Sequence, residues 1–132
     1  MTGRFFTARK GADMATMNGI IEKVSRLKPN AVDDRDIAAW IAELDARLML
    51  ELDAPEKMAK EWPEDGDEQL MADEPYDELY AFYAVAMIEF YQREYSNYNN
   101  TMAMFNDRVA DFRRYYRRTH RPTNSTPWEG TM

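Results

Sequence analysis

Residues 75–122 read PYDELYAFYAVAMIEFYQREYSNYNNTMAMFNDRVADFRRYYRRTHRP, and this stretch decides the fold. Two apolar-periodic runs meet at a turn rich in tyrosine and asparagine, and the second run ends in a cluster of arginines. Apolar residues spaced three and four positions apart indicate a helix with one buried face. The stretch therefore predicts a helical hairpin whose far end is positively charged.

The second run has the more regular repeat. We expect it to be helical from Asn97 or Asn99 to Thr119, and its large apolar residues recur at four and three positions: Tyr98, Met102, Phe105, Val109, Phe112 and Tyr116. A seven-residue apolar repeat is typical of packed antiparallel helices. We interpret Tyr95–Asn100 as the short connection, with its asparagines capping the helices.

The first run should begin at Pro75, behind Asp73 or Glu74, because proline is favoured at the first helical position. One face of this run consists of Leu79, Phe82, Tyr83, Ala86 and Phe90, and the other faces are apolar as well. A helix with so little polar surface is covered on several sides, either by its own domain or by a neighbouring subunit.

Two further helices are predicted upstream. One runs from Thr16 to Leu27, with an apolar face of Met17, Ile20, Val24 and Leu27, and ends before Pro29. The other runs from Asp33 or Asp34 to Leu52, with an apolar stripe of Ile37, Trp40, Ile41, Leu44, Leu48 and Leu52. Together with the hairpin they predict an all-α fold, a small antiparallel bundle of about four helices.

The segment between the second and third helices, Asp53–Asp73, should be a long acidic loop. It contains two prolines, Gly66 and the run EWPEDGDEQ, a composition that disfavours regular structure. We expect at most a helical turn near 56–61, and we expect Leu70 and Met71 to return the loop to the core. Residues 14–121 would form the helical domain, with flexible arms at 1–13 and 122–132.

Composition excludes several classes of protein. The 132 residues fit one domain, and the absence of cysteine excludes disulfides and thiolate metal sites. No run approaches the roughly 20 apolar residues of a membrane-spanning helix, and the N-terminus lacks the apolar stretch of a signal peptide. We therefore expect a protein that is soluble and intracellular where it is made, with no membrane partner.

The net charge of −7 is unevenly distributed. Residues 43–78 contain fourteen acidic residues against three basic ones, whereas residues 108–121 contain six arginines against Asp111. Opposite poles suit head-to-tail contacts between copies or docking to a charged partner. The overall acidity argues against sequence-specific DNA binding, in which basic patches supply most of the affinity.

No set of residues predicts catalysis, a metal site or a cofactor. His120 has no nucleophile or second histidine beside it, and a cation at a helix end is stabilised by the helix dipole. The carboxylates Asp73, Glu74, Asp77 and Glu78 likewise suit a helix N-terminus. The segment Asp65-Gly66-Asp67-Glu68 lacks the spacing of a calcium loop. We therefore predict a protein that is not an enzyme.

Two sets of residues are the candidate contacts. The first, for contact with another copy of the chain or with a partner, consists of Arg113, Arg114, Arg117, Arg118, Arg121 and Trp128. The arginines could be solvated surface, could pair with acidic residues of another copy or partner, or could contact nucleic acid. Trp128 is either an interface anchor or a chance exposed aromatic residue. The second set, for contacts of the acidic loop, consists of Glu61, Glu64, Asp65, Asp67 and Glu68.

The hairpin stretch, and in particular YNNTMAMFN and YYRRTH, resembles small proteins encoded in the head-to-tail gene cluster of long-tailed phages and prophages. Upstream, LKPNAVDDRDIAAWIAELDARL is similar to their usual beginning, and the resemblance covers about residues 17–122. The leader 1–13 and the tail after Pro122 fall outside it.

Proteins of this kind are head-tail connectors, or adaptors. The resemblance implies an all-helical subunit that forms a twelvefold ring beneath the portal protein and extends the DNA channel. It would place the arginine set and Trp128 in contact with neighbouring subunits or the portal, and the acidic set in loop contacts or the channel lining. Genomic DNA would pass through without sequence-specific binding, and the ring would offer a platform for stopper and tail-terminator proteins. The expected location is the virion neck, with host cytoplasm during assembly. The alternatives are a stopper or tail-completion protein of the same neck, or a small helical DNA-binding or regulatory protein.

Overall fold

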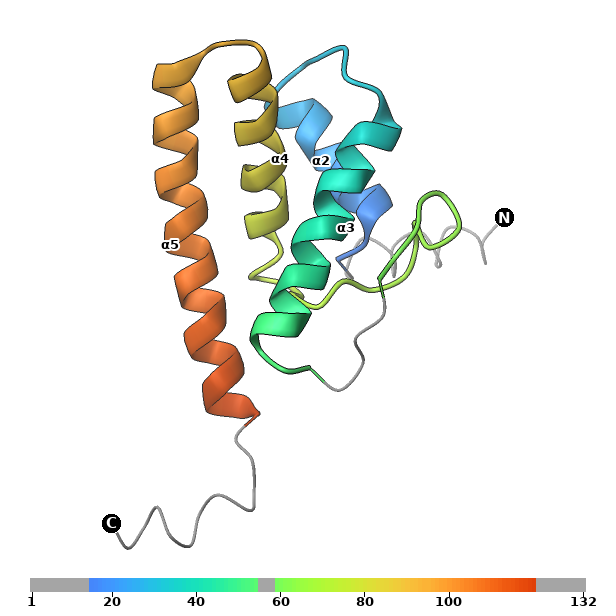
Figure 1. Ribbon diagram of the computed structural model, residues 1–132, viewed down its shortest axis with the longest axis vertical. Coiled ribbons are helices and arrows are strands. Elements are labelled where there is room, and N and C mark those ends of the chain that lie inside the picture. The colour runs from blue at the N-terminus through green and yellow to red at the C-terminus, as the bar shows by residue number, and fades with distance from the viewer. Residues whose placement is uncertain (1–14, 55–58, 121–132) are drawn as a thin grey trace, which may run out of the picture.

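In the computed structural model, which describes residues 15–54 and 59–120, the chain folds into an antiparallel bundle of four helices. Their bounds are α2 Met17–Leu27, α3 Asp34–Glu51, α4 Glu78–Tyr91 and α5 Tyr95–Thr119. Successive helices run in opposite directions (Figure 1). Within the described residues, the only β pairing is an isolated bridge between Thr16 and Gln69. The all-α prediction is confirmed, and the predicted arms 1–13 and 122–132 lie outside the described residues.

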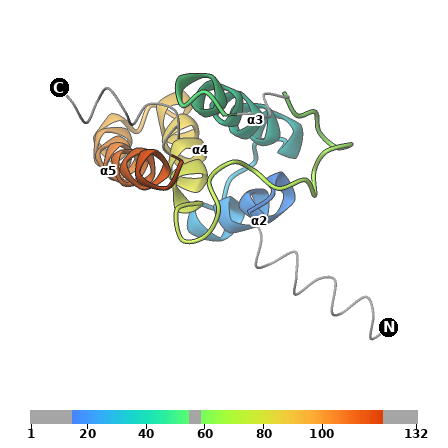
Figure 2. The same cartoon turned by 90° about the horizontal axis from the view of Figure 1, so that it is seen from below.

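Helix α4 lies at the centre of the bundle and contacts the other three helices (Figure 2). Residues from all round it are buried: Leu79, Tyr80, Ala81, Ala84, Val85, Ala86 and Ile88. The prediction that this helix is covered on several sides is therefore confirmed. One member of the predicted face is misplaced, because Phe90 is 45% exposed.

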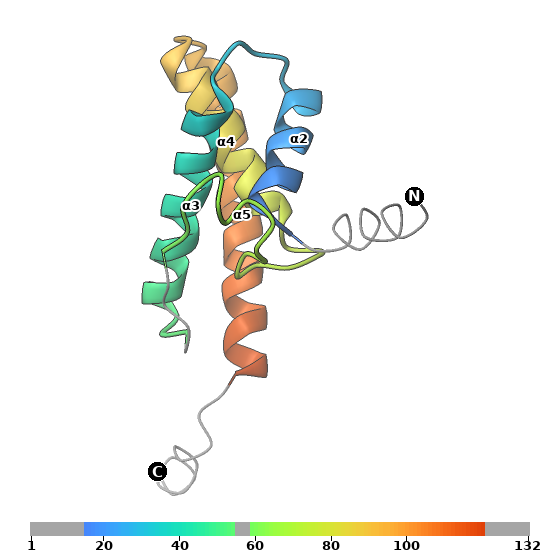
Figure 3. The same ribbon diagram turned by 90° about the vertical axis from the view of Figure 1, so that its right-hand side faces the viewer.

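Helix α5 packs chiefly against α4 and extends beyond the lower end of the bundle (Figures 1 and 3). Of its 25 residues, only Phe105, Val109 and Phe112 are buried, and all three belong to the predicted seven-residue repeat. The other members of that repeat are half-buried beside them. One seam thus holds α5 to the bundle and leaves most of its surface open to solvent.

The upstream helices pack as their apolar stripes predict. Thr16 caps α2, since its Oγ1 accepts a hydrogen bond from Gly19 N at 3.0 Å, and Asp33 caps α3 in the same way by accepting from Arg35 N at 3.1 Å. The predicted stripe residues of α3 are buried or packed against the core. In α2 the last predicted core residue, Leu27, is 55% exposed.

The start of α4 differs from the prediction. The helix begins at Glu78 rather than Pro75, and residues 74–77 form turns. In these turns Tyr76 N donates to Asp73 O at 2.7 Å. The ring of Tyr76 stacks on Tyr115 of α5, with 4.7 Å between ring centroids. This tertiary contact fixes the segment as a turn beneath α5, which the preference of proline for a helix start does not reveal.

The connection between α4 and α5 is also shorter than predicted. Helix α5 begins at Tyr95, so the predicted asparagine caps lie inside the helix. Arg93, with φ 63°, makes the turn, where its N–H donates to Phe90 O and Glu94 N donates to Glu89 O at 2.8 Å. These two bonds form a Schellman motif, which closes the carbonyl end of α4. Glycine is the usual residue at the left-handed position of this motif, so the sequence, which has Arg93 there, did not indicate it.

The acidic loop packs onto the bundle. Leu70 is 1% exposed, and its N–H donates to Ala15 O at 2.8 Å, while Met71 packs against the core. The predicted return of the loop through these two residues is confirmed. Residues 59–61 are not helical, and the rest of the turn predicted near 56–61 lies outside the described residues.

Candidate interaction surfaces

Two of the predicted contact arginines pair within the chain. Nε of Arg113 lies 2.6 Å from Glu51 Oε2, and its Nη2 donates to Oε1 at 3.0 Å. Arg117 lies 3.7 Å from the same carboxylate. Glu51 is the last residue of α3, so these ion pairs hold the free end of α5 against α3. Arg113 and Arg117 are therefore partly committed to the fold.

Arg114 and Arg118 lie one turn apart and are both exposed. Arg114 pairs with Asp111 on its own helix, and the guanidinium of Arg118 lies 5.9 Å from the centroid of the Tyr115 ring. No acidic side chain among the described residues forms an ion pair with Arg118. We call Arg114 and Arg118 the basic face. The other two predicted contacts, Arg121 and Trp128, lie outside the described residues.

The acidic loop is docked against α2. Asn18 N donates to Gly66 O at 3.0 Å, and the side chain of Asn18 joins Trp62 and Asp67 through hydrogen bonds of 2.9 Å each. A Cβ at Gly66 would lie 2.6 Å from Asn18 Nδ2, so glycine permits this close approach. The sequence did not reveal this docking because the partner, Asn18, lies more than forty residues upstream.

The five predicted acidic residues divide into two groups. Asp65 accepts a hydrogen bond from Glu61 N, and Asp67 accepts one from Asn18, both at 2.9 Å. The side chains of Glu61, Glu64 and Glu68 are exposed and form no ion pair with any described basic residue. Glu68 lines a hollow that Tyr116 and His120 at the end of α5 also line. We call Glu61 and Glu64 the acidic face; the loop segment that carries them lies on the side of the bundle away from α5 (Figure 2).

A buried polar network, which the sequence did not reveal, fixes the loop. Asp45 of α3 is 1% exposed; its Oδ1 accepts from Tyr80 Oη at 2.7 Å and Met71 N at 2.8 Å. Its Oδ2 accepts from Lys60 Nζ at 2.9 Å. Tyr80 Oη in turn accepts from Ala72 N at 2.9 Å. Burial raises the pKa of the Tyr80 hydroxyl well above its ordinary value, so it remains a donor.

The carboxylates around the start of α4 form structural contacts. Asp77 is buried, forms no cap hydrogen bond and lies 3.9 Å from Lys23 Nζ. Burial raises the pKa of Asp77, and Lys23 opposes that effect. Glu78 pairs with Arg108 at 3.2 Å. No group of three potential metal ligands occurs among the residues that the structure describes.

His120 ends α5 and stacks on Tyr116, with ring centroids 3.9 Å apart. Its Nδ1 lies 3.1 Å from Tyr116 O and 2.9 Å from the hydroxyl of Thr119, which contacts the carbonyls of the last turn. These contacts use the ring to complete the helix end, as the helix-end interpretation of this histidine expects.

A cluster of exposed aromatic residues covers the corner where α4 turns into α5. Phe90, Tyr91 and Tyr95 are 45%, 65% and 52% exposed. Tyr91 stacks on Trp40 of α3 at 5.9 Å, and Phe90 contacts Tyr98 at 5.3 Å. We call these five residues the aromatic corner. The sequence shows an apolar helix followed by a turn rich in tyrosine, but it does not show that these rings face solvent.

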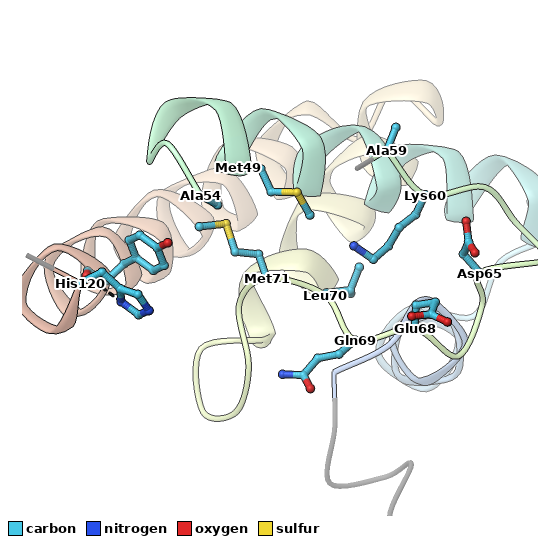
Figure 4. A pocket seen from close by; sticks show the side chains of 11 residues that line it. Met49, Ala54, Ala59, Lys60, Asp65, Glu68, Gln69, Leu70, Met71 and His120 are labelled. Atoms are coloured by element: carbon cyan, nitrogen blue, oxygen red, sulfur yellow. Dashed lines mark hydrogen bonds between the residues drawn. The ribbon is translucent and has the colours of Figure 1, made fainter. Parts of the chain in front are cut away.

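A groove runs beneath the bundle between the end of α5 and the acidic loop (Figure 4). It has a volume of about 660 Å³. Met49 and Ala54 line it from α3 and the residues that follow, Tyr116 and His120 from α5, and Met71 from the loop. Sequence reasoning missed this groove because its walls come from three separate segments.

Comparison with protein-family models, with curated proteins and with solved structures gave no match to this chain. No helix among the described residues has the length and apolar character needed to cross a membrane.

Proposed function

We propose that the chain is a structural protein of a phage neck, a head-tail connector or adaptor. Copies of it would form a ring under the portal protein, extend the DNA channel and join the capsid to the tail. The location would be the virion neck, after assembly in the host cytoplasm. The proposal rests on the resemblance of the hairpin stretch and on one observation. Positive charge on α5 and negative charge on the acidic loop lie on different sides of the bundle and are not fully paired within the chain.

This separation of charge suits a contact in which the basic face of one copy binds the acidic face of the next. The basic face, Arg114 and Arg118, lies on α5, and the loop segment that carries the acidic face, Glu61 and Glu64, lies on the side of the bundle away from that helix (Figure 2). When one surface of a subunit binds a different surface of the next, the contacts generate a ring if the rotation closes. The proposed ring, twelvefold in proteins of this kind, places the basic face of each copy against the acidic face of its neighbour.

The two ends of α5 suggest how such a ring is oriented. In proteins that this chain resembles, the C-terminal segment docks on the portal, so the lower end of α5 would point to the capsid. The aromatic corner lies at the opposite end of the same helix (Figure 1). Exposed aromatic side chains are frequent hot spots of interfaces. We therefore assign the aromatic corner to the tail-side stopper or tail-terminator proteins.

The charge of the chain also suits a DNA channel. With a net charge of −7, a ring of copies repels the phosphate backbone wherever acidic residues face the channel. Genomic DNA would then slide past without sequence-specific binding. This supports a passive conduit in preference to a DNA-binding protein.

The test is to mix the full chain with the portal protein encoded by the same genome. An adaptor binds the isolated portal ring directly, which increases the mass of the portal complex by a whole ring of subunits. A stopper or tail-completion protein binds only after a separate adaptor has been added. Failure to bind portal under either condition would exclude both neck functions.

A small DNA-binding or regulatory protein is the second candidate. One observation favours it, the exposed Arg118 beside the Tyr115 ring, because arginine and aromatic side chains together contact single-stranded nucleic acid. Binding to random DNA that weakens as salt rises would support it. No binding at low salt would exclude it.

A further inference from the structure

The groove beneath the bundle begins where the described part of α5 ends. His120, the cap of the helix, is one of its lining residues, and Tyr116 lines it one turn earlier. The opposite end reaches Lys60 and Asp65 of the acidic loop (Figure 4). Its volume of about 660 Å³ is within the range of clefts that bind a small ligand or a few side chains.

The groove walls suit a large apolar side chain. Met49 and Met71 project their thioether side chains into it (Figure 4). Tyr116, which stacks on His120, also lines it. Methionine adapts its shape and makes favourable contacts with aromatic rings. Polar groups, among them Glu68 and Gln69, line the loop side. A large aromatic residue with polar neighbours matches this combination.

The chain itself carries such a segment next to the groove. Residues 121–132, RPTNSTPWEGTM, follow His120 directly, and Trp128 is their only large aromatic residue. Trp128 lies eight residues beyond His120, so it can reach about 26 Å from the helix end at roughly 3.3 Å per residue. Pro122 and Pro127 restrict the segment and lower the entropy that binding must overcome.

We infer that residues 121–132 occupy the groove of their own chain, with Trp128 seated against Met49 and Met71. Attachment through a short linker gives the segment an effective concentration on the order of 1 mM. A free peptide that bound with a dissociation constant of about 0.1 mM would therefore be docked roughly ten to one when attached. The same linkage favours the chain's own groove over that of a second copy.

Docking of this kind shields Trp128 until a competing surface binds it more tightly. In the proposed connector, the portal would be that competitor, and the tail would change partner during assembly. The inference about the free chain does not depend on this, because it concerns the isolated protein. Its test is therefore independent of portal binding.

The test uses ¹⁹F NMR of the full chain labelled with 5-fluorotryptophan. The three tryptophans give three resonances, and Trp128→Phe identifies that of Trp128. Because the chain has no cysteine, Gln69→Cys provides a single site for a spin label in the groove. Gln69 is exposed, so the substitution should preserve the fold. Asp107→Cys, at a side chain 78% exposed on α5, is the matched control.

We expect the label at Gln69 to remove most of the Trp128 signal, and the label at Asp107 to leave it largely intact. Both effects should stay constant as the protein is diluted. A sharp Trp128 resonance unaffected by the Gln69 label would overturn the inference. Signal loss that disappears on dilution would overturn it too, since the tail would then occupy a second copy.

Met71→Glu supplies a separate measurement, because a charge in the groove should release Trp128 and shift its resonance toward that of the unfolded chain. Met104→Glu places the same charge at a residue 45% exposed on α5 and should leave the resonance unchanged. If Met71→Glu prevents folding, the spin label at Gln69 remains the test of whether Trp128 lies in the groove. An unchanged Trp128 resonance in a folded Met71→Glu protein would contradict the inference.

Discussion

Asp45 is the buried charge on which the arrangement of the acidic loop depends. Its carboxylate accepts hydrogen bonds from α4 and from two positions of the loop. A buried charge is costly unless it is fully hydrogen-bonded, and three donors satisfy this one. The network thereby links the loop to α3 and α4 in a single geometry.

Tyr80→Phe should reduce the free energy of unfolding by about 1–3 kcal/mol, because it leaves Ala72 N–H without its acceptor and removes a donor from Asp45. Chemical denaturation measures the change. Tyr83→Phe is the matched control, since the Tyr83 hydroxyl accepts only a 3.4 Å bond from exposed Arg47. We expect the control to cost less than about 0.5 kcal/mol. Equal effects of the two substitutions would contradict the role of the network.

Asp77 should make stability depend on pH. Burial raises its pKa above the ordinary value of 3.8, so the folded state favours the protonated carboxyl. The stability this provides is present below pH 3.8 and is lost as pH rises through the higher folded pKa. Asp77→Asn removes the effect, so the stability of the variant relative to the native chain should increase from acid to neutral pH.

Denaturant midpoints measured across that pH range test this prediction. Asp107→Asn removes the same charge from a side chain that is 78% exposed and controls for the change in net charge. A difference between the Asp77→Asn and native proteins that is constant with pH, or that falls as pH rises, would show that burial does not govern this carboxyl.

At the scale of single elements, both α3 and α4 end in a Schellman motif without glycine. Asp53, with φ 54°, closes α3, and Arg93, with φ 63°, closes α4. At each end the N–H of the following residue, Ala54 or Glu94, donates to the carbonyl five positions earlier. Non-glycine residues adopt this left-handed conformation at a steric cost. Arg93 is therefore a position where the chain can be made more stable.

Arg93→Gly should raise the free energy of unfolding by about 0.5–1 kcal/mol, because glycine adopts positive φ without that cost. Arg26→Gly is the matched control in the last turn of α2, where glycine should lower stability by up to about 1 kcal/mol. Thermal unfolding of both variants shows whether stability rises, as we expect for Arg93→Gly, or falls, as we expect for Arg26→Gly. A loss of stability at Arg93 would show that its side chain matters more than its backbone conformation.

How much the sequence predicts follows from how far apart the interacting residues lie. The four helices were predictable because the spacing of Phe105, Val109 and Phe112, and of the α3 stripe, is a local signal. The docked loop was not, because Trp62 meets Asn18 and Lys60 meets Asp45 across long separations. The pairing of Arg113 with Glu51 escaped prediction for the same reason.

The surfaces were predictable in part. Arginines in the last turns of α5 and glutamates in the loop could be named from the sequence as charged, but only the fold shows that they lie on opposite sides. It also shows that Arg113 and Arg117 are held by Glu51, which leaves Arg114 and Arg118 as the basic face. The aromatic corner could not be predicted, because it depends on the turn at Arg93 and arginine does not indicate such a turn.

At the scale of the whole molecule, the positive charge of α5 and the negative charge of the acidic face lie on different sides of the bundle, and we propose that both are contact surfaces for other proteins. Helix α5 is held by one seam and by Glu51, and its outer surface carries the basic face. Exposed ion pairs contribute little individually, at most about 1 kcal/mol each. A ring repeats the contact at every interface, so reversal of one face would introduce repulsion at each of them.

The most direct measurement is the mass of the portal complex formed with charge-reversed chains. One variant carries Arg114→Glu with Arg118→Glu, and the other carries Glu61→Lys with Glu64→Lys. We predict that each variant alone fails to form a ring on the portal, and that an equal mixture of the two restores it, because each reversed face then meets its complement. Rings formed by either variant alone, to the same extent as by the native chain, would contradict the head-to-tail contact.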